Sequence, residues 1–99
     1  MSESLPKLNL DEIAAQLDVL TGWSIDKSGS LYREFKFVDF AQAFSFMTCV
    51  AKVAEDMDHH PDWTNVYNRV SVRLLTHDAG GITMRDIELA RQMNALSQM

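Results

Sequence analysis

The sequence predicts a single α+β domain in which three helices cover one face of a four-stranded antiparallel sheet. The chain has 99 residues, enough for one domain and too few for two. Its hydrophobic pattern changes period along the chain, and the helix-like and strand-like segments follow the order α-β-β-α-β-β-α. Two pairs of adjacent strands predict hairpins, and amphipathic helices need an apolar sheet face to cover. We therefore treat residues 1–99 as one domain, with residues 1–8 expected to be loosely ordered.

The first third of the chain predicts a helix followed by a hairpin. Asn9 is a suitable N-cap, and Gly22 ends the helical pattern. The apolar residues that recur at helical spacing are Leu10, Ile13, Ala14, Leu17 and Leu20. Residues 23–37 then alternate around a turn at residues 26–30, which predicts a β-hairpin with Arg33 as the polar exception on its apolar face.

A second helix is predicted from an Asp39 cap to about Met57. Its apolar residues follow an i, i+4, i+7 rhythm, which predicts a buried stripe. The residues assigned to this stripe are Phe40, Phe44, Met47, Ala51 and Ala54, with Ala43, Val50 and Val53 widening it. Cys49 lies within the same pattern, so we expect a buried, unreactive thiol. A single cysteine also excludes an internal disulfide.

A second hairpin and a last helix complete the predicted fold. Residues 63–66 and 70–76 alternate like strands, and residues 67–69 suit a tight turn between them. Thr83, followed three residues later by Asp86, predicts a capped helix. The apolar residues of this helix are Ile87, Ala90, Met93 and Leu96.

Charge and the absence of targeting signals narrow the class of function. The net charge is −5, which argues against nucleic acid because phosphate binding needs a concentrated basic face. The longest apolar-rich stretch, residues 40–54, is interrupted by polar side chains and is too short to cross a bilayer. The N-terminus lacks the basic flank and apolar core of a secretory signal. We therefore expect a cytoplasmic protein that acts on a weakly charged small molecule or on another protein.

The three histidines are the strongest candidates for a functional site. His59 and His60 lie where the second helix gives way to a strand, and His77 follows the last strand. A hairpin that turns near Asn68 would bring these two segments side by side, so the three imidazoles are expected to share one site. Imidazole titrates near neutral pH and can either donate or accept a proton there.

Three interpretations of this cluster remain open from the residues alone. Acid–base catalysis needs nothing beyond positioned histidines. A catalytic zinc ion would need three protein ligands, but adjacent side chains usually diverge and the chain has no HExxH or CxxC motif. The histidines could also be surface loop residues without a role. No serine or cysteine is placed for a nucleophilic triad.

One spaced set of residues resembles the signature of the pterin-4a-carbinolamine dehydratases. The set consists of Glu55, His59, His60, Pro61, Tyr67, His77 and Asp86. It spans 32 positions, residues 55–86, and every fixed position of the signature is filled. The predicted order of helices and strands agrees with the family along nearly the whole chain.

The resemblance implies a hydro-lyase that removes water from a 4a-hydroxytetrahydropterin to give the quinonoid dihydropterin, without cofactor or metal. It implies that His59 and His77 act as general acids, and that His60, the third catalytic histidine, chiefly binds and orients the substrate. The implied substrate-binding residues are His59, His60, Pro61, Thr76, His77, Asp78 and Ala79. The implied supporting residues are Glu55, Asp58, Trp63 and Asp86.

The resemblance also implies partners and an alternative function. The functional partner would be an aromatic amino-acid hydroxylase, whose tetrahydropterin by-product is the substrate. The chain would form a homodimer or homotetramer and would not contact nucleic acid or membrane directly. Mammalian members of the family also serve as dimerisation cofactors for a homeodomain transcription factor. The alternative is therefore a regulatory protein-binding module in which the pterin site is of minor importance.

Overall fold

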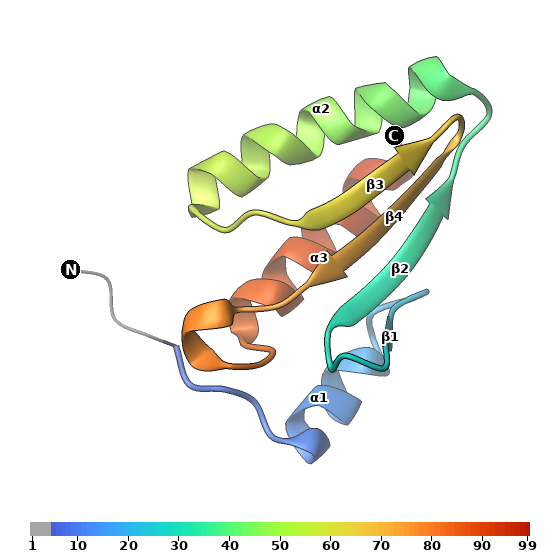
Figure 1. The fold of residues 1–99 in the computed structure, drawn as a ribbon. Helices are drawn as coiled ribbons and strands as arrows, with labels where there is room; N and C mark the ends of the chain where they lie inside the picture. The colour runs from blue at the N-terminus through green and yellow to red at the C-terminus, as the bar shows by residue number, and fades with distance from the viewer. Residues whose placement is uncertain (1–4) are drawn as a thin grey trace.

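A computed structural model describes residues 5–99 as a four-stranded antiparallel sheet with three helices, which confirms the predicted α+β fold (Figure 1). The elements are α1 (Leu10–Leu17), β1 (Ser24–Ile25), β2 (Leu31–Lys36), α2 (Phe40–Met57), β3 (Asp62–Val66), β4 (Arg69–Leu74), the 3-10 helix η1 (His77–Ala79) and α3 (Met84–Ser97). The strand order β1-β2-β4-β3 joins the two predicted hairpins along β2 and β4. The sequence did not predict η1. No helix within residues 5–99 is both long and apolar enough to span a membrane.

The predicted caps determine where the three long helices begin. Asn9 accepts the backbone N–H of Glu12, whose carboxylate accepts the N–H of Asn9, so α1 starts with a capping box. At the start of α2 the side chain of Asp39 accepts the N–H of Gln42, without the reciprocal bond of a capping box. Thr83 and Asp86 form a second capping box at the start of α3. Each cap satisfies backbone donors that the first helical turn leaves free.

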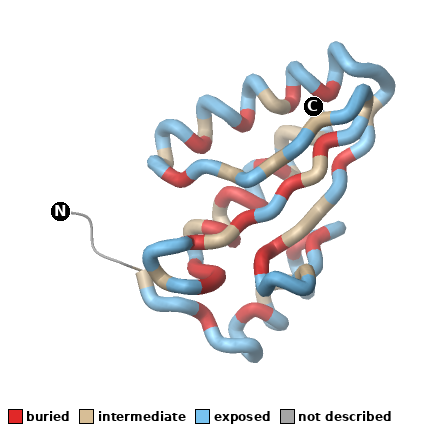
Figure 2. The backbone as a smooth tube through the Cα atoms, viewed as in Figure 1, coloured by how far each residue is buried: buried red, intermediate tan, exposed pale blue. Residues whose placement is uncertain are grey.

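The core lies between the helices and one face of the sheet. Cross-strand pairs such as Leu31 with Leu74 and Phe35 with Val70 turn the same face inward. Buried positions alternate along β4 and recur on one side of α2 (Figure 2). Burying an aliphatic or aromatic side chain of this size contributes roughly 1.5–3 kcal/mol, so this face supplies most of the stabilisation.

The predicted stripe on α2 is confirmed at Ala43, Val50 and Ala54, and Met47 and Val53 pack against the core, but its aromatic residues are wrong. The buried residues are Ala43, Phe46, Val50 and Ala54. Phe40 and Phe44 are instead 49% and 51% exposed. Phe46 takes the inward position because its ring packs against those of Phe35 and Phe37, with centroids 4.8 and 5.0 Å away.

Cys49, Leu10 and Leu8 also lie in surroundings that differ from the expected ones. Cys49 is exposed rather than buried, because its side of α2 faces away from the sheet. Leu10 begins α1 but is 82% exposed. Of the segment expected to be loosely ordered, residues 1–4 lie outside the described residues. Leu8, at its end, is buried and donates its N–H to the carbonyl of Ile82 at 2.8 Å.

Arg33, the polar exception on the core face of the first hairpin, is bound to α3. Its Nη1 donates to the carboxamide oxygen of Asn94 at 2.6 Å and to the carbonyl of Thr21 at 2.8 Å. Trp23 donates to the same Asn94 oxygen at 2.8 Å. Burial lowers the pKa of Arg33 from its usual value, and the guanidinium lies 4.2 Å from the ring centre of Phe35. Asn94 therefore anchors the hairpin, a partnership that the sequence did not reveal.

Candidate active site

All three histidines line one pocket, at the end of the sheet where α2 stops and β4 runs into η1 (Figure 1). The pocket has a volume of about 280 Å³. Its lining residues are Asp58, His59, His60, Leu75, Thr76, His77, Asp78 and Arg85. The register of β3 and β4 pairs Asp62 with Arg73, so the residues just before β3 lie beside those just after β4. The pairing of two strands thus brings together segments that are distant in sequence.

A left-handed residue at the end of α2 sends the two adjacent histidines into different surroundings. Asp58 has φ 53° and ψ 42°, and its N–H reaches the carbonyls of Ala54 and Glu55. The next N–H, that of His59, also bonds to Ala54. After this reversal His59 is only 8% exposed, whereas the side chain of His60 is 61% exposed.

A buried carboxylate, that of Asp86, holds the ring of His59. Asp86 is fully buried, and its Oδ1 lies 2.6 Å from Nε2 of His59. Its Oδ2 accepts the hydroxyl of Thr76 at 2.8 Å and the N–H of Thr83 at 2.9 Å. Thr76 and Thr83 both donate to Asp86, as they would to an ionised carboxylate, which only accepts hydrogen bonds. We therefore assign the hydrogen between Asp86 and His59 to Nε2 of His59. Such a partner fixes both the tautomer and the orientation of an imidazole.

The two threonines extend this hydrogen-bond network in one direction. The hydroxyl of Thr76 donates to Asp86, so it accepts from the hydroxyl of Thr83, 2.8 Å away. The Thr83 oxygen in turn accepts the N–H of Arg85 at 3.2 Å. Within residues 5–99, no buried side-chain nitrogen or oxygen lacks a partner. The first turn of α3 and the ring of His59 therefore depend on the same network.

His60 and His77 lie on the open side of the pocket. Nε2 of His60 is 2.9 Å from a carboxylate oxygen of Glu55, and both side chains are largely exposed. An ion pair in such a position adds little to stability. His77 begins η1 and is exposed. In the described part of the chain, no side-chain hydrogen bond restrains its ring, so it can turn toward a ligand.

The other predicted site residues are divided between the pocket wall and its surroundings. Pro61, Trp63 and Ala79 are not among the lining residues, and Trp63 packs against the core instead. Leu75 and Arg85 do line the pocket, although the sequence did not single them out. The only sequence signal for Arg85 is its place in the first turn of the capped helix.

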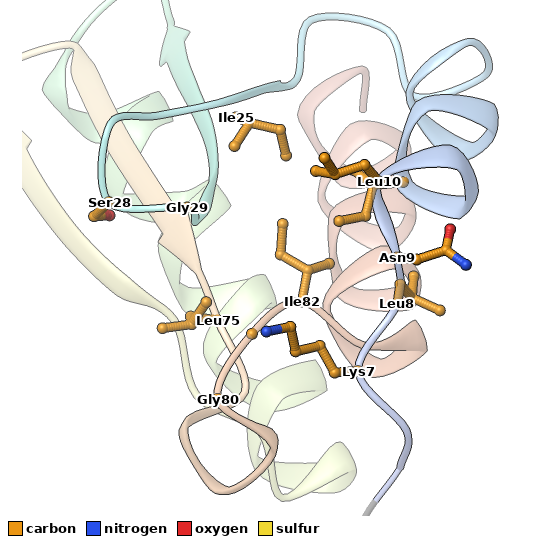
Figure 3. A pocket seen from close by; sticks show the side chains of 12 residues that line it. Lys7, Leu8, Asn9, Leu10, Ile25, Ser28, Gly29, Leu75, Gly80 and Ile82 are labelled. Atoms are coloured by element: carbon orange, nitrogen blue, oxygen red, sulfur yellow. The ribbon is translucent and has the colours of Figure 1, made fainter.

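A larger apolar cavity of about 470 Å³ lies beside the histidine pocket, and the two share Leu75 (Figure 3). Leu8, Leu10, Ile25 and Ile82 are among the apolar residues of its wall. It contains no histidine and no carboxylate, and Lys7 is the one titratable side chain in its lining. We therefore identify the histidine pocket as the candidate active site because of its titratable side chains, although the apolar cavity is larger.

The described residues contain no ready set of metal ligands. Across residues 5–99, no group of three or more His, Cys, Asp or Glu is placed to hold a metal ion. His59 and His60 each engage a carboxylate through Nε2, which leaves one ring nitrogen on each for another partner.

Sequence comparisons identify relatives along nearly the whole chain. Residues 6–96 match the family described as pterin 4 alpha carbinolamine dehydratase. A protein of Solibacter usitatus, provisionally named pterin-4-alpha-carbinolamine dehydratase, is 52% identical over 92% of this chain and 95% of its own length. A protein of Mesorhizobium japonicum with the same provisional name is 56% identical over 89% of this chain and 91% of its own length.

Solved structures agree with the sequence comparisons. A protein of Brucella melitensis, described as a transcriptional coactivator/pterin dehydratase, superimposes with a TM-score of 0.89 at 47% identity, covering 92% of this chain and 98% of the other. A pterin dehydratase-like protein described as a RuBisCO assembly factor in the alpha-carboxysome gives a TM-score of 0.66 over 77% of this chain and 89% of its own. Its 22% identity indicates a shared fold alone. From the family match and the relatives of about 50% identity, the chain belongs to the pterin 4 alpha carbinolamine dehydratase family.

Proposed function

We propose that this chain removes water from a 4a-hydroxytetrahydropterin to give the quinonoid dihydropterin. The observation that carries the proposal is the meeting of His59, His60 and His77 at one pocket in a member of this family. The pocket offers groups that can move protons, which is the chemistry that the reaction needs.

The reaction requires one proton to be given and one to be taken. The bond between C4a and the hydroxyl oxygen breaks, and that oxygen leaves as water after receiving a proton. N5 loses its proton, and a double bond forms between C4a and N5. No electron is gained or lost overall, so a positioned acid and a positioned base suffice, each worth roughly 10²–10⁴-fold in rate.

The proposed roles follow from the different surroundings of the three rings. Because Asp86 engages Nε2 of His59, Nδ1 is the nitrogen left to exchange a proton with the substrate. His77, exposed on the segment that follows β4, would act as the second acid. Whichever of His59 and His77 is neutral would take the proton that N5 loses. His60, tethered to Glu55 at the rim, would bind and orient the heterocycle.

A coupled assay tests this proposal. A purified aromatic amino-acid hydroxylase would be run at limiting tetrahydropterin, with this protein added or omitted. We expect the parent protein to speed the appearance of quinonoid dihydropterin, and the double variant His59→Ala with His77→Ala to lose nearly all of that effect. A folded double variant, checked by circular dichroism, that is as active as the parent would contradict the proposed roles.

His60→Ala separates binding from proton transfer. We expect a raised KM with a modest change in kcat, because the ring is proposed to hold the substrate rather than to exchange its protons. A collapsed kcat with an unchanged KM would instead place His60 among the acids.

The second candidate function is a regulatory role, which is supported by the description of one related structure. The Brucella melitensis structure with 47% identity is described as a transcriptional coactivator as well as a pterin dehydratase. A strain lacking this gene distinguishes the two roles. If the catalytically inactive double variant restores the phenotype as well as the parent does, protein binding rather than dehydration is the required activity.

We also propose a cellular location, a partner enzyme and an oligomeric state for this dehydratase. The chain would act in the cytoplasm, recycle the pterin by-product of an aromatic amino-acid hydroxylase, and form a homodimer or homotetramer. Dependence of hydroxylase turnover on this protein in cell extracts would support that partnership.

A further inference from the structure

The apolar cavity beside the histidine pocket has the size and the walls of a ligand site. Its volume of about 470 Å³ falls in the range of roughly 300–1,000 Å³ that is typical of small-molecule sites. Such sites have mainly apolar walls with a few polar groups. The aliphatic residues of this wall are Leu8, Leu10, Ile13, Ile25, Leu75 and Ile82. The proposed reaction makes no use of this space.

Lys7 supplies the one charge at the cavity. None of the ion pairs formed within residues 5–99 includes its amine. Two other polar side chains of the wall already have partners. The side-chain oxygen of Asn9 accepts the N–H of Glu12 at 2.8 Å, and the hydroxyl of Ser28 donates to Asp26 at 2.6 Å. The amine of Lys7 is therefore the group that would select a charged ligand.

The missing side chain of Gly81 makes room for Lys7 along the cavity wall. A methyl group on Gly81 would lie 2.8 Å from Cδ and 2.9 Å from Cγ of Lys7, closer than such atoms approach in proteins. The N–H of Leu8 bonds to the carbonyl of Ile82 at 2.8 Å, which holds the segment beside Lys7 against the same loop. The amine of Lys7 points toward the space between Leu75 and Ile82 (Figure 3). The cation thus reaches the apolar wall.

This arrangement of charge indicates the kind of ligand. An ammonium group would be repelled by Lys7 and would find no carboxylate in the wall, which argues against free amino acids. A phosphate group carries about two negative charges and three strong acceptors, too many for a single lysine. The net charge of −5 opposes anions only weakly here, because salt screens charges beyond about 10 Å. A single carboxylate on a hydrocarbon body matches the wall best.

We propose that the apolar cavity binds a medium-chain fatty acid, with the carboxylate paired to Lys7 and the chain against the aliphatic wall. If each non-hydrogen atom takes about the volume of a water molecule, roughly 30 Å³, the cavity has room for about fifteen such atoms. A chain of about eight to ten carbons fits this space. Because no histidine lines the cavity, the inference does not depend on the proposed dehydration.

Amide NMR titrations of the isotope-labelled chain with octanoate and with octan-1-ol test the site. The two probes have the same chain length and differ in charge. We expect octanoate to shift the amide signals of Gly29, Gly81 and Ile82 saturably, with a Kd on the order of 1 mM. We expect octan-1-ol to shift the same signals with about two- to fivefold weaker binding, because a partly exposed ion pair contributes little.

Two variants examine the proposed role of the amine. Lys7→Met keeps an unbranched stem without the charge, so the ratio of the two Kd values should fall to about one. Gly81→Ala should have a similar effect, because the new methyl group displaces the stem of Lys7. Gly81 does not have a positive φ, so alanine is compatible with its backbone. Lys52→Met, at an exposed lysine of α2 that does not line this cavity, is the matched control and should keep the parental ratio.

Several outcomes would overturn the fatty-acid site. These are the absence of saturable shifts with octanoate, shifts confined to the histidine pocket, equal Kd values for octanoate and octan-1-ol in the parent, or a parental preference that survives in Lys7→Met. Binding of phenylalanine as tight as that of octanoate would also contradict the proposal, because its ammonium group should be rejected beside Lys7.

Discussion

At the scale of single residues, Asp86 performs two tasks with its two carboxylate oxygens. Oδ1 holds His59, and Oδ2 accepts the N–H of Thr83 at the start of α3. A fully buried carboxylate is tolerable only where donors surround it, and Thr76 supplies the third. Removing any one of these donors would leave part of a buried charge without a partner.

The variant Asp86→Asn tests this double role. An amide offers one acceptor oxygen and places N–H groups where the carboxylate accepted, so at least one of the three donors loses its partner. We expect the free energy of unfolding to fall by about 1–3 kcal/mol. We also expect kcat to fall about 10–100-fold with little change in KM, because the ring of His59 loses the partner that fixes its tautomer and orientation.

Urea unfolding and steady-state kinetics would measure the two effects of Asp86→Asn. A nitrogen NMR spectrum of the imidazoles adds a test that a purely structural role would not affect, since the parent should carry its His59 proton on Nε2. Parental kcat in a destabilised variant would show that Asp86 supports the helix but not the chemistry.

At the scale of elements, local signals in the sequence predicted most of the fold. Periodicity and capping residues located the helices and strands because each depends on neighbours within a few positions. The pairing of strands then predicted that residues 59, 60 and 77 share one pocket. These signals were sufficient because a hairpin places its two outer ends together whatever packs on its faces.

The predictions that were wrong or missing concern contacts between elements that are distant in the sequence. α2 carries aromatic residues on two sides, and helical spacing alone could not tell whether Phe44 or Phe46 would meet the sheet. The exposure of Cys49 follows from the same choice. The contact of Arg33 with Asn94 joins residues 61 positions apart, which no local pattern encodes. The role of Arg85 as a wall of the pocket was hidden for the same reason.

The C-terminal turn of α2 gives a prediction about backbone strain. Asp58 adopts a left-handed conformation, which an alanine adopts at a cost of about 1–2 kcal/mol and a glycine adopts freely. We expect Asp58→Ala to lower the free energy of unfolding by about 1 kcal/mol and Asp58→Gly to preserve or raise it. Urea titrations of both variants would measure this, and equal destabilisation by the two would contradict a backbone cause.

The turn between β1 and β2 gives a prediction about pH. The hydroxyl of Ser28 first, then the N–H groups of Ser30 and Ser28 and the guanidinium of Arg73, lower the pKa of Asp26 to about 2 against the opposing effect of burial. Because the pKa in the unfolded chain is about 3.9, the stabilisation is complete above that pH and disappears as the pH falls toward 2.

The variant Asp26→Asn tests this stabilisation. We expect it to lower the free energy of unfolding by about 1 kcal/mol at pH 7, after allowance for screening by solvent. Denaturation at pH 7, 4 and 3 should show the difference from the parent shrinking below pH 4. The exposed Asp56→Asn serves as the matched control, and a difference that stays constant with pH would rule out an electrostatic origin.

At the scale of the whole molecule, apolar residues at the start of α2 remain uncovered. Val38 is 77% exposed, and Phe40 and Phe44 are each about half exposed with their rings 5.7 Å apart. Clustered apolar side chains on a surface are typical of protein contacts. These exposed apolar residues are consistent with the proposed self-association. The outer face of the sheet is the other surface through which two copies of the chain could associate.

Sedimentation velocity would test this assembly. We expect the parent chain to sediment as a dimer or tetramer and Phe44→Ser to shift the distribution toward smaller species, because a hydroxyl group there weakens an apolar contact. Asp56→Ala, an exposed change at the other end of the same helix, is a suitable control. A monomeric parent would contradict self-association, and an unchanged Phe44→Ser assembly would point to the sheet face.

Leu75 borders three spaces, since it lines the histidine pocket, the apolar cavity and a small polar cavity of about 60 Å³ beside the histidines. This common wall has a practical consequence for inhibitor discovery. A polar fragment bound among the histidines and an apolar fragment bound in the larger cavity would lie close together on either side of Leu75. Joining two such fragments by a short tether makes the second binding event intramolecular, at an effective concentration in the millimolar range. A compound built in this way would owe its selectivity to the apolar cavity, because that wall is made of side chains unrelated to the acid–base chemistry.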